Sequence, residues 1–412
     1  MQYGCIGEHL TYSFSREIHG ALAEYLYELT DVPAGELDAF MTKRDFKAIN
    51  VTIPYKQAVI PYLTQIHKIA ADIGAVNTVV NKDGQLYGYN TDFGGMVDLL
   101  SRAGISLEGK KVLILGTGGT SKTAMAVAKH LGAASVFRVS RTGKCGALSY
   151  EAVKKSHLDA QILINTTPRG MVSYESGMAI DPALFPQLSG VVDVVYNPLR
   201  TELIARARAM GVPTAGGLYM LVRQAVLASE IFLNIKYPKG TTERVYRAVK
   251  ASKENIVLIG MPGCGKTTVG ELLARKLGRP FYDVDALVEE KTGMHPSQII
   301  SRRSEVAFRQ IESEVIRELA SKNGAVIATG GGSVLRQQNV DVLRMNGKLI
   351  FLDRSLQLLM PTDQRPLSAT KEALQARYTE RYDIYTSAAD AVVSGDGTPE
   401  AVAQLAERSF ME

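Results

Sequence analysis

The chain has 412 residues, which is more than one ordinary hydrophobic core accommodates and predicts two or three domains. Hydrophobic residues make up 46% and charged residues 22% of the chain, a balance that excludes an intrinsically disordered protein. The net charge of +5 suits anionic small substrates, and the absence of a concentrated basic run predicts that nucleic acid is not a partner.

The cysteines and the start of the chain bear on its compartment. Cys5, Cys145 and Cys264 have no paired or metal-like spacing, so we expect a reducing environment and no disulfide framework. The first residues lack a basic stretch followed by an apolar core, and no apolar stretch reaches the roughly 18 residues of a spanning helix. We therefore expect a cytoplasmic protein that uses no membrane; the sequence leaves a homo-oligomer open.

The residues before about 100 predict a compact α/β lobe with strands near 48–53 and 75–80. Lys56 follows the first of these strands after a turn fixed by Pro54, and Asp92 stands at the start of a predicted helix. A lysine and an aspartate that share a pocket can pass a proton to a ketone oxygen as a hydride arrives. Two independent surface charges are the alternative interpretation.

A strand at 111–115, a glycine-rich turn and a helix to Leu131 predict a dinucleotide-binding unit. The turn fits only the first part of G-x-G-x-x-G, because Ser121 occupies the third glycine position, so a purely structural turn remains the alternative. The next strand, 136–140, ends in a segment that carries two cations and no acid, which favours the 2′-phosphate of NADP over NAD. A solvated basic loop is the alternative there.

Residues 1–235 resemble shikimate dehydrogenase. The matching strings include Ser13-Phe-Ser15 with His19, the N-V-T-x-P-x-K string that ends at Lys56, and Asn90-Thr-Asp92. The resemblance implies that Lys56 and Asp92 form the catalytic pair. It implies that the substrate is held by Ser13, Ser15, Thr52, Asn77, Asp92 and Gln224. It implies that NADP(H) is held by Gly116, Gly118, Gly119, Ser140, Arg141, Thr142, Lys144, Gly217 and Met220.

Residues 235–253 predict an interdomain linker. Pro238 and Gly240 interrupt regular structure, charged residues are dense, and the segment shows little apolar periodicity.

A strand at 256–259 is followed by Gly260–Thr267, which fits G-x-x-x-x-G-K-[ST] at every fixed position. The glycines let backbone N–H groups curl around a phosphate, and the helix that starts near Lys266 adds its positive end. Lys266 would reach the β- and γ-phosphates of ATP, while the Thr267 hydroxyl would bind Mg²⁺. The alternative, a chance glycine-rich turn, is weak between a strand and a helix.

Three further segments bear on which molecule accepts the phosphoryl group. Asp283 and Asp285 are predicted on one face near a strand end, where one carboxylate could hold Mg²⁺ and the other could orient a hydroxyl; a solvated acidic turn is the alternative. Arg309 and Glu312, at i and i+3 of a predicted helix, can form an ordinary surface pair. The glycines at 330–332 follow a strand and predict a close approach of the backbone to another group.

In this order the motifs resemble shikimate kinase, and the resemblance covers nearly all of residues 254–410. It implies catalytic roles for Lys266, Asp285 and Arg365, with Arg365 on a mobile lid. It implies that Arg309 and Arg381 pair with the shikimate carboxylate. The remaining contacts that it implies are Gly331 and Gly332 with shikimate, Gly263, Cys264, Gly265, Thr267 and Thr268 with ATP, and Thr267 and Asp283 with Mg²⁺.

The expected architecture is therefore α/β throughout. A dehydroshikimate-binding lobe, 1–95 completed by about 218–234, precedes a Rossmann NADP-binding lobe, 96–217, the linker, 235–253, and a P-loop kinase domain of nucleoside-monophosphate-kinase type, 254–412. The expected functions are the reduction of 3-dehydroshikimate to shikimate by NADPH and the 3-phosphorylation of shikimate by ATP.

Two alternatives remain at this point. One is a metabolite-sensing regulator that has lost its reacting groups, against which Lys56, Asp92, Lys266 and Asp285 are all present. The other is a reductase half that is specific for quinate or an amino analogue.

Overall fold

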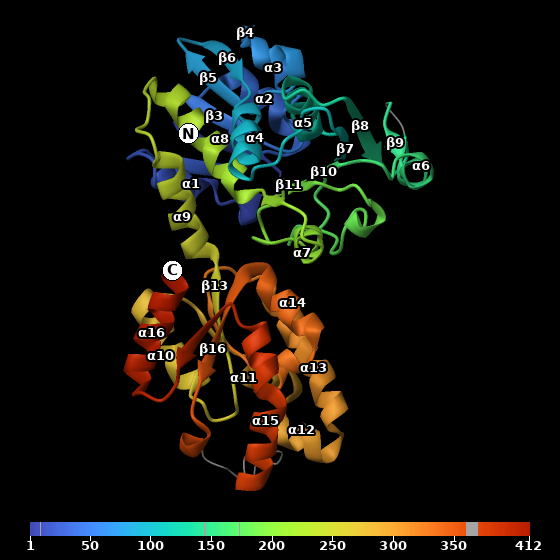
Figure 1. Ribbon diagram of the computed structural model, residues 1–412. Helices are drawn as coiled ribbons and strands as arrows, with labels where there is room; N and C mark the ends of the chain where they lie inside the picture. Colours follow the sequence, from blue (N-terminus) through green and yellow to red (C-terminus); the bar gives the residue numbers. More distant parts are fainter. Residues whose placement is uncertain (9, 144–145, 173, 360–369) are drawn as a thin grey trace. The chain divides into compact units, whose positions relative to one another are not determined.

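The computed structural model describes residues 1–8, 10–143, 146–172, 174–359 and 370–412. These residues form two compact units, Met1–Val249 and Lys250–Glu412. Both units are α/β, which confirms the expected fold class (Figure 1). No helix in these ranges is long and apolar enough to cross a membrane.

The first unit begins with a mixed sheet whose strand order is β2-β1-β3-β5-β6-β4. Its strands are β1 Tyr3–Gly7, β2 Tyr27–Asp31, β3 Ala48–Val51, β4 Gln65–Ile66, β5 Thr78–Lys82 and β6 Gln85–Tyr89. Strands β1 and β3 run parallel, and β5 runs antiparallel to both β3 and β6. The ends of β1, β3 and β6 and the start of β5 therefore share one edge of the sheet.

The second sheet of this unit is parallel, with the order β12-β11-β10-β7-β8-β9. Its strands are β7 Lys111–Leu115, β8 Ser135–Ser140, β9 Leu148–Ser149, β10 Ile162–Asn165, β11 Gly190–Asp193 and β12 Thr214–Gly216. The central strands are continuous runs of buried aliphatic residues, as a sheet covered on both faces requires. All of its strands present their carboxyl ends at one edge.

The helices of the first unit pack on these two sheets. They are α1 Ser15–Gly20, α2 Leu37–Lys43, α3 Lys68–Ile73, α4 Asp92–Arg102, α5 Gly119–His130, α6 Tyr150–Ser156, α7 Glu202–Ala209 and α8 Leu218–Leu233. Helices α4 and α8 pack against each other, and Met96 and Met220 from these two helices belong to one core. Helix α8 thus packs against a helix from the part of the chain before residue 103 and shares a core with the parallel sheet.

The expected linker contains helix α9, Thr241–Lys253. Its Val245 and Val249 are buried in a core with Phe14, Ile18 and Val222. This corrects the expectation of little apolar periodicity, because the two valines stand at i and i+4 and form a narrow apolar stripe between charged neighbours. The boundary between the two units falls inside this helix, after Val249.

The second unit is built on a parallel sheet with the order β14-β15-β13-β16-β17. Its strands are β13 Asn255–Ile259, β14 Phe281–Asp283, β15 Val326–Ala328, β16 Gly347–Asp353 and β17 Ala391–Ser394. Its helices are α10 Lys266–Leu277, α11 Val284–Thr292, α12 Pro296–Arg302, α13 Glu305–Leu319, α14 Gln337–Asn346, α15 Lys371–Ala388 and α16 Pro399–Met411. Helices α10 and α16 lie on one side of the strands, and α13 and α14 lie on the other (Figure 1).

Candidate active sites

A cavity of about 230 Å³ lies in the first unit, between the shared edge of the mixed sheet and the carboxyl edge of the parallel sheet. Lys56 and Asp92, which follow β3 and β6, meet there: the Lys56 ammonium donates to Asp92 Oδ2 over 2.6 Å. Their side chains are 12% and 8% exposed, so this is not a pair of independent surface charges. The lysine also donates to Thr120 Oγ1 at 3.3 Å, a contact from the first turn of α5. A buried cation held in this way can deliver a proton to an oxygen that enters the cavity.

The predicted substrate-binding residues of this half line the same cavity. They are Ser13, Ser15, Thr52, Asn77 and Gln224. Ser13 donates to Ser15 across 3.1 Å, and Asn77 Nδ2 donates to Gln224 Oε1 at 3.4 Å. Asn77 and Gln224 are 147 positions apart in sequence, and helix α8 brings the glutamine to the mixed sheet.

The structure gives roles to Asn50 and Thr91, two residues of the matching strings to which the motifs assigned none. Thr91 accepts from Asn77 Nδ2 at 2.9 Å and lies 3.3 Å from Gln224 Oε1, so it joins the two amides. Asn50 lines the cavity and donates to Thr78 Oγ1 at 3.1 Å. All of these groups are buried and satisfied, which fixes the orientation of the hydroxyl and amide groups that face the cavity.

The glycine turn at 116–118 leads from β7 into α5. Gly116 has φ +115°, and a Cβ there would stand 2.7 Å from Thr166 Oγ1. A Cβ on Gly119 would stand 3.1 Å from Lys56 Cβ, so the helix start and the lysine are closely apposed. Ser121, in the place of a third glycine, is fully buried and donates back to the Gly118 carbonyl at 3.0 Å. The serine therefore satisfies a polar group within the first turn of the helix.

Arg141 and Thr142 are exposed directly after β8, beside Ser140, at the same sheet edge as the glycine turn. Gly217 and Met220 line the cavity itself. An open glycine turn at a helix N-terminus with an exposed arginine one strand away fits a dinucleotide that carries a 2′-phosphate. Lys144, the last member of the predicted cofactor set, lies outside the described residues.

A buried carboxylate supports the loop that follows β10 and lines the same cavity as Lys56. Asp193 is fully buried and accepts from Asn165 Nδ2 at 2.9 Å and from Thr201 Oγ1 at 2.7 Å. Asn165 Oδ1 in turn accepts from the N–H and hydroxyl of Thr167, which lines the cavity. Burial raises the pKa of Asp193 to about 6, against the opposing effect of these hydrogen bonds.

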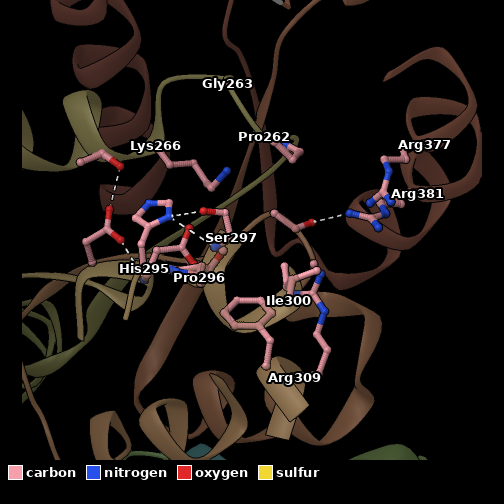
Figure 2. A pocket seen from close by; sticks show the side chains of 18 of the residues that line it. Pro262, Gly263, Lys266, His295, Pro296, Ser297, Ile300, Arg309, Arg377 and Arg381 are labelled. Carbon is pink, nitrogen blue, oxygen red and sulfur yellow. Dashed lines mark hydrogen bonds between the residues drawn. The ribbon is translucent and has the colours of Figure 1, made fainter. Parts of the chain in front are cut away.

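A second cavity, of about 420 Å³, lies in the second unit at the carboxyl ends of β13, β14 and β15 (Figure 2). The predicted P-loop follows β13 and contributes Gly263, Gly265, Lys266, Thr267 and Thr268 to the lining. Lys266 is 8% exposed, and its ammonium donates to the carbonyls of Gly260 at 2.8 Å and Met261 at 3.0 Å. The side chain of Cys264 is 1% exposed and does not line the cavity.

The two acidic residues after β14 occupy different elements. Asp283 ends the strand and caps α11 by accepting from the N–H of Asp285 at 2.9 Å, whereas Asp285 lies in the first turn of the helix. This corrects the expectation that both carboxylates share one strand face. Asp283 Oδ2 accepts from Thr267 Oγ1 at 2.7 Å, which places a hydroxyl and a carboxylate together beside the P-loop. Burial, followed by the charges of Asp283 and Glu312, raises the pKa of Asp285 to about 6.

A hydroxyl and a carboxylate beside a phosphate-binding loop fit Mg²⁺, which is usually held by one or two side chains, water and substrate phosphates. Within the described ranges, no cluster of three or more His, Cys, Asp or Glu side chains is placed to hold a metal by itself.

The expected surface pair of Arg309 and Glu312 is buried. Glu312 is completely inaccessible, Arg309 is 11% exposed, and Arg309 Nη1 donates to Glu312 Oε2 at 2.9 Å. Glu312 also accepts from Ser333 Oγ at 2.7 Å. The pair itself was expected, but its burial was not, because an i, i+3 pair looks the same in sequence on either face of a helix. The backbone at 332 makes room for the arginine, since a Cβ on Gly332 would stand 2.1 Å from Arg309 Nη2.

Helix α15 contributes Arg381, which the motifs predicted, and Arg377, which they did not; both line the cavity (Figure 2). Arg381 donates to the carbonyl of Gly331 at 3.4 Å, and the Tyr385 hydroxyl donates to the same oxygen. His295, Pro296 and Ser297 at the start of α12 also line the cavity. The spacing of Arg377 one helical turn before Arg381 was a readable signal. Arg365, the predicted lid residue, lies outside the described residues.

Comparisons with known proteins identify the family of each unit. The model of the shikimate dehydrogenase substrate-binding domain matches residues 5–79, and the model of shikimate kinase matches residues 262–409. A shikimate dehydrogenase (NADP(+)) of Clostridium perfringens is 35% identical over 271 residues, which is 60% of this chain and 98% of that protein.

Solved structures give the same result for the first unit. The shikimate dehydrogenase 1 of Peptoclostridium difficile has a TM-score of 0.56 at 32% identity and is covered to 98%, against 60% of this chain. The shikimate 5-dehydrogenase of Thermus thermophilus in complex with NADP(H) and shikimate has a TM-score of 0.54 at 30% identity and is covered to 99%, again against 60% of this chain. The chain belongs to the shikimate dehydrogenase family and continues, over residues 262–409, as a shikimate kinase domain.

Proposed function

We propose that the chain is a bifunctional enzyme that reduces 3-dehydroshikimate to shikimate with NADPH and then phosphorylates the 3-hydroxyl of shikimate with ATP. The observation that carries the proposal is that, within the described residues, each unit brings its predicted reacting groups around one cavity. In the first, Lys56 and Asp92 meet at 2.6 Å beside a row of hydroxyl and amide groups. In the second, the P-loop faces Asp285 and three arginines.

At the first site, bound NADPH supplies the hydride. Lys56 donates a proton to the carbonyl oxygen of the substrate as this oxygen becomes a hydroxyl, and Asp92 keeps the ammonium in place. Ser13, Ser15, Thr52, Asn77 and Gln224 bind the hydroxyl groups and the carboxylate of the substrate. Arg141 pairs with the 2′-phosphate of the cofactor, assisted by Ser140 and Thr142.

At the second site, ATP supplies the phosphoryl group and Mg²⁺ neutralises charge on its oxygens. Thr267 and Asp283 hold the metal, and the P-loop N–H groups with Lys266 bind the phosphates, so Lys266 exchanges its two carbonyl partners for phosphate oxygens. Asp285 accepts a hydrogen bond from the acceptor hydroxyl and takes its proton. Gly331 and Gly332 bring backbone close to the ring, and Arg309 and Arg381 face the carboxylate.

The domain division follows from these roles. We assign dehydroshikimate binding to residues 1–95 together with 218–234, NADP binding to residues 96–217, and the kinase to residues 254–412. A cytoplasmic location fits the two described cysteines, Cys5 and Cys264, which are free and buried.

Two single variants test the proposal. Lys56→Ala should abolish NADPH oxidation with 3-dehydroshikimate and leave ATP-dependent phosphorylation of shikimate intact, and Lys266→Ala should do the reverse. Each variant is the control for the other, because both are assayed in the same chain. Loss of both activities in a variant that is still folded would contradict two independent sites. A wild-type protein that binds shikimate without converting it would instead indicate a sensor.

A further inference from the structure

The three arginines of the kinase cavity differ in how their charges are balanced. Arg309 has two carboxylate partners, since Nη1 donates to Glu312 at 2.9 Å and Nη2 to Glu305 at 3.1 Å. Arg377 and Arg381 have none: within the described ranges, no carboxylate oxygen lies within 4 Å of either guanidinium. Among the three arginines, the two without a carboxylate partner in the described ranges are therefore the ones on α15.

Arg377 and Arg381 stand at i and i+4 of α15, on the same face of the helix and toward the same cavity (Figure 2). Two like charges at this spacing repel each other, and burial adds a desolvation cost. Arg381 is only 4% exposed, and its Nε has no hydrogen-bond partner within the described structure. Burial and then the charge of Arg381 lower the pKa of Arg377. Such a pair becomes favourable when an anion lies between the two guanidinium groups.

We propose that Arg377 is a substrate-binding residue of the kinase site and that Arg377 and Arg381 together hold the carboxylate of the acceptor. The inference rests on the proposed function, which makes shikimate the acceptor. It also changes the role of Arg309. The charge of Arg309 is already balanced by Glu305 and Glu312. Arg377 therefore supplies the second unbalanced positive charge for the carboxylate, a role that the motifs had given to Arg309.

The phosphates have other ligands. Lys266 and the P-loop line the cavity, and Thr267 pairs with Asp283 beside that loop. Figure 2 shows Lys266 on the opposite side of the view from Arg377 and Arg381. A carboxylate matches two guanidinium forks in size and geometry. The acceptor carboxylate is therefore the anion that α15 is placed to receive.

The experiment compares two acceptors in steady-state kinase assays of the full chain. One acceptor is shikimate, and the other is its carboxamide, which has nearly the same shape and no charge. Arg377→Gln should raise the KM for shikimate roughly 10- to 100-fold, the expected loss for a charge-assisted contact, and should leave the KM for the carboxamide within about twofold. The KM for ATP should not change. Arg377→Lys keeps the charge without the fork and should fall between wild type and Arg377→Gln.

Arg408→Gln is the matched control, because Arg408 is exposed and its partner is Glu412 at the far end of α16. It should leave all three KM values unchanged. The inference is wrong if Arg377→Gln raises the KM of both acceptors equally, or if it raises the KM for ATP instead. Failure of the wild-type chain to phosphorylate shikimate would overturn the proposed function itself. Thermal unfolding of each variant, followed by circular dichroism, separates loss of binding from loss of fold.

Discussion

The backbone at Gly332 leaves no space for a side chain, because Arg309 Nη2 would lie 2.1 Å from a Cβ built there and the guanidinium is held from behind by Glu312. We predict that Gly332→Ala displaces Arg309, lowers kinase kcat/KM for shikimate by at least about 100-fold, equivalent to roughly 3 kcal/mol, and leaves dehydrogenase activity unchanged. Steady-state assays of both reactions on one preparation measure this.

Gly397→Ala is the matched control in the same unit. The nearest atom to its added Cβ, Ala401 Cβ, is 3.4 Å away, an ordinary contact. Wild-type kinase activity in Gly332→Ala would show that the arginine can move aside without cost.

Because the pKa of Asp285 is raised to about 6, we predict that kinase activity falls on the acidic side of the pH–rate profile. If the ionised carboxylate accepts the proton of the acceptor, kcat/KM should be constant near pH 8 and fall about tenfold per pH unit below about 6. A pH–rate profile between pH 5 and 8 measures this, and a flat profile would contradict the assignment of Asp285 as the base. Asp283→Ala should move this fall to lower pH, because the charge of Asp283 contributes to the raised pKa, although it should also weaken metal binding.

The ionised form of Asp285, which the reaction needs, is the form that disfavours folding. The folded-state pKa of this carboxyl, about 6, lies above the ordinary value of 3.8, so the native unit binds this proton more tightly than the unfolded chain does. The contribution of Asp285 to stability is therefore most favourable below pH 4 and is lost as the pH rises through about 6. The kinase site retains a carboxylate that is unfavourable for folding at neutral pH.

Many site residues could be predicted because their chemistry is carried by short strings. Lys266 and Thr267 are fixed by their distance from the P-loop glycines, and the structure places both at the cavity. The role of Thr91 and the burial of Glu312 could not be predicted in the same way, because each depends on which face of an element meets a neighbour that is distant in sequence. The 2.6 Å contact between Lys56 and Asp92 also depends on how two segments distant in sequence meet.

At the scale of elements, the glycine turns marked strand-to-helix junctions correctly, and α10 ends at Gly278 in the left-handed conformation as its position suggested. The junction of β14 and α11 was misplaced because a strand of three residues carries too little alternation to locate its end. Helix α9 was missed for a related reason. Charged residues surround its two valines, and Pro238 and Gly240 precede it, so local composition outweighed a two-residue stripe.

Helix α9 is part of the first unit's core through Val245, which is fully buried beside Phe14 and Val222. We predict that Val245→Ala destabilises the dehydrogenase unit by about 2 kcal/mol, the value of two buried carbon atoms. The exposed neighbour Arg244→Ala should have no measurable effect. Urea unfolding followed by loss of dehydrogenase activity tests both, and equal midpoints for Val245→Ala and wild type would mean that α9 contributes nothing to this unit.

At the scale of the whole molecule, the division after Val249 implies two separately stabilised cores. We predict two thermal transitions that respond to different ligands. NADP⁺ at 100 times its dissociation constant should stabilise only the transition that abolishes dehydrogenase activity, and ADP with Mg²⁺ only the transition that abolishes kinase activity, each by about 2.7 kcal/mol. Differential scanning calorimetry with each ligand in turn measures this. A single transition that both ligands raise would show that the units unfold together.

The continuous backbone through α9 also has a consequence for metabolic flux. Because both catalysts are translated from one message, they are present in equal numbers in every cell, whatever the level of expression. The steady-state pool of shikimate then depends on the kinetic constants of the two sites and on the supply of 3-dehydroshikimate and ATP, and not on the relative abundance of two enzymes. A change in gene dosage alters the throughput of the pair without altering the ratio at which the intermediate is made and consumed.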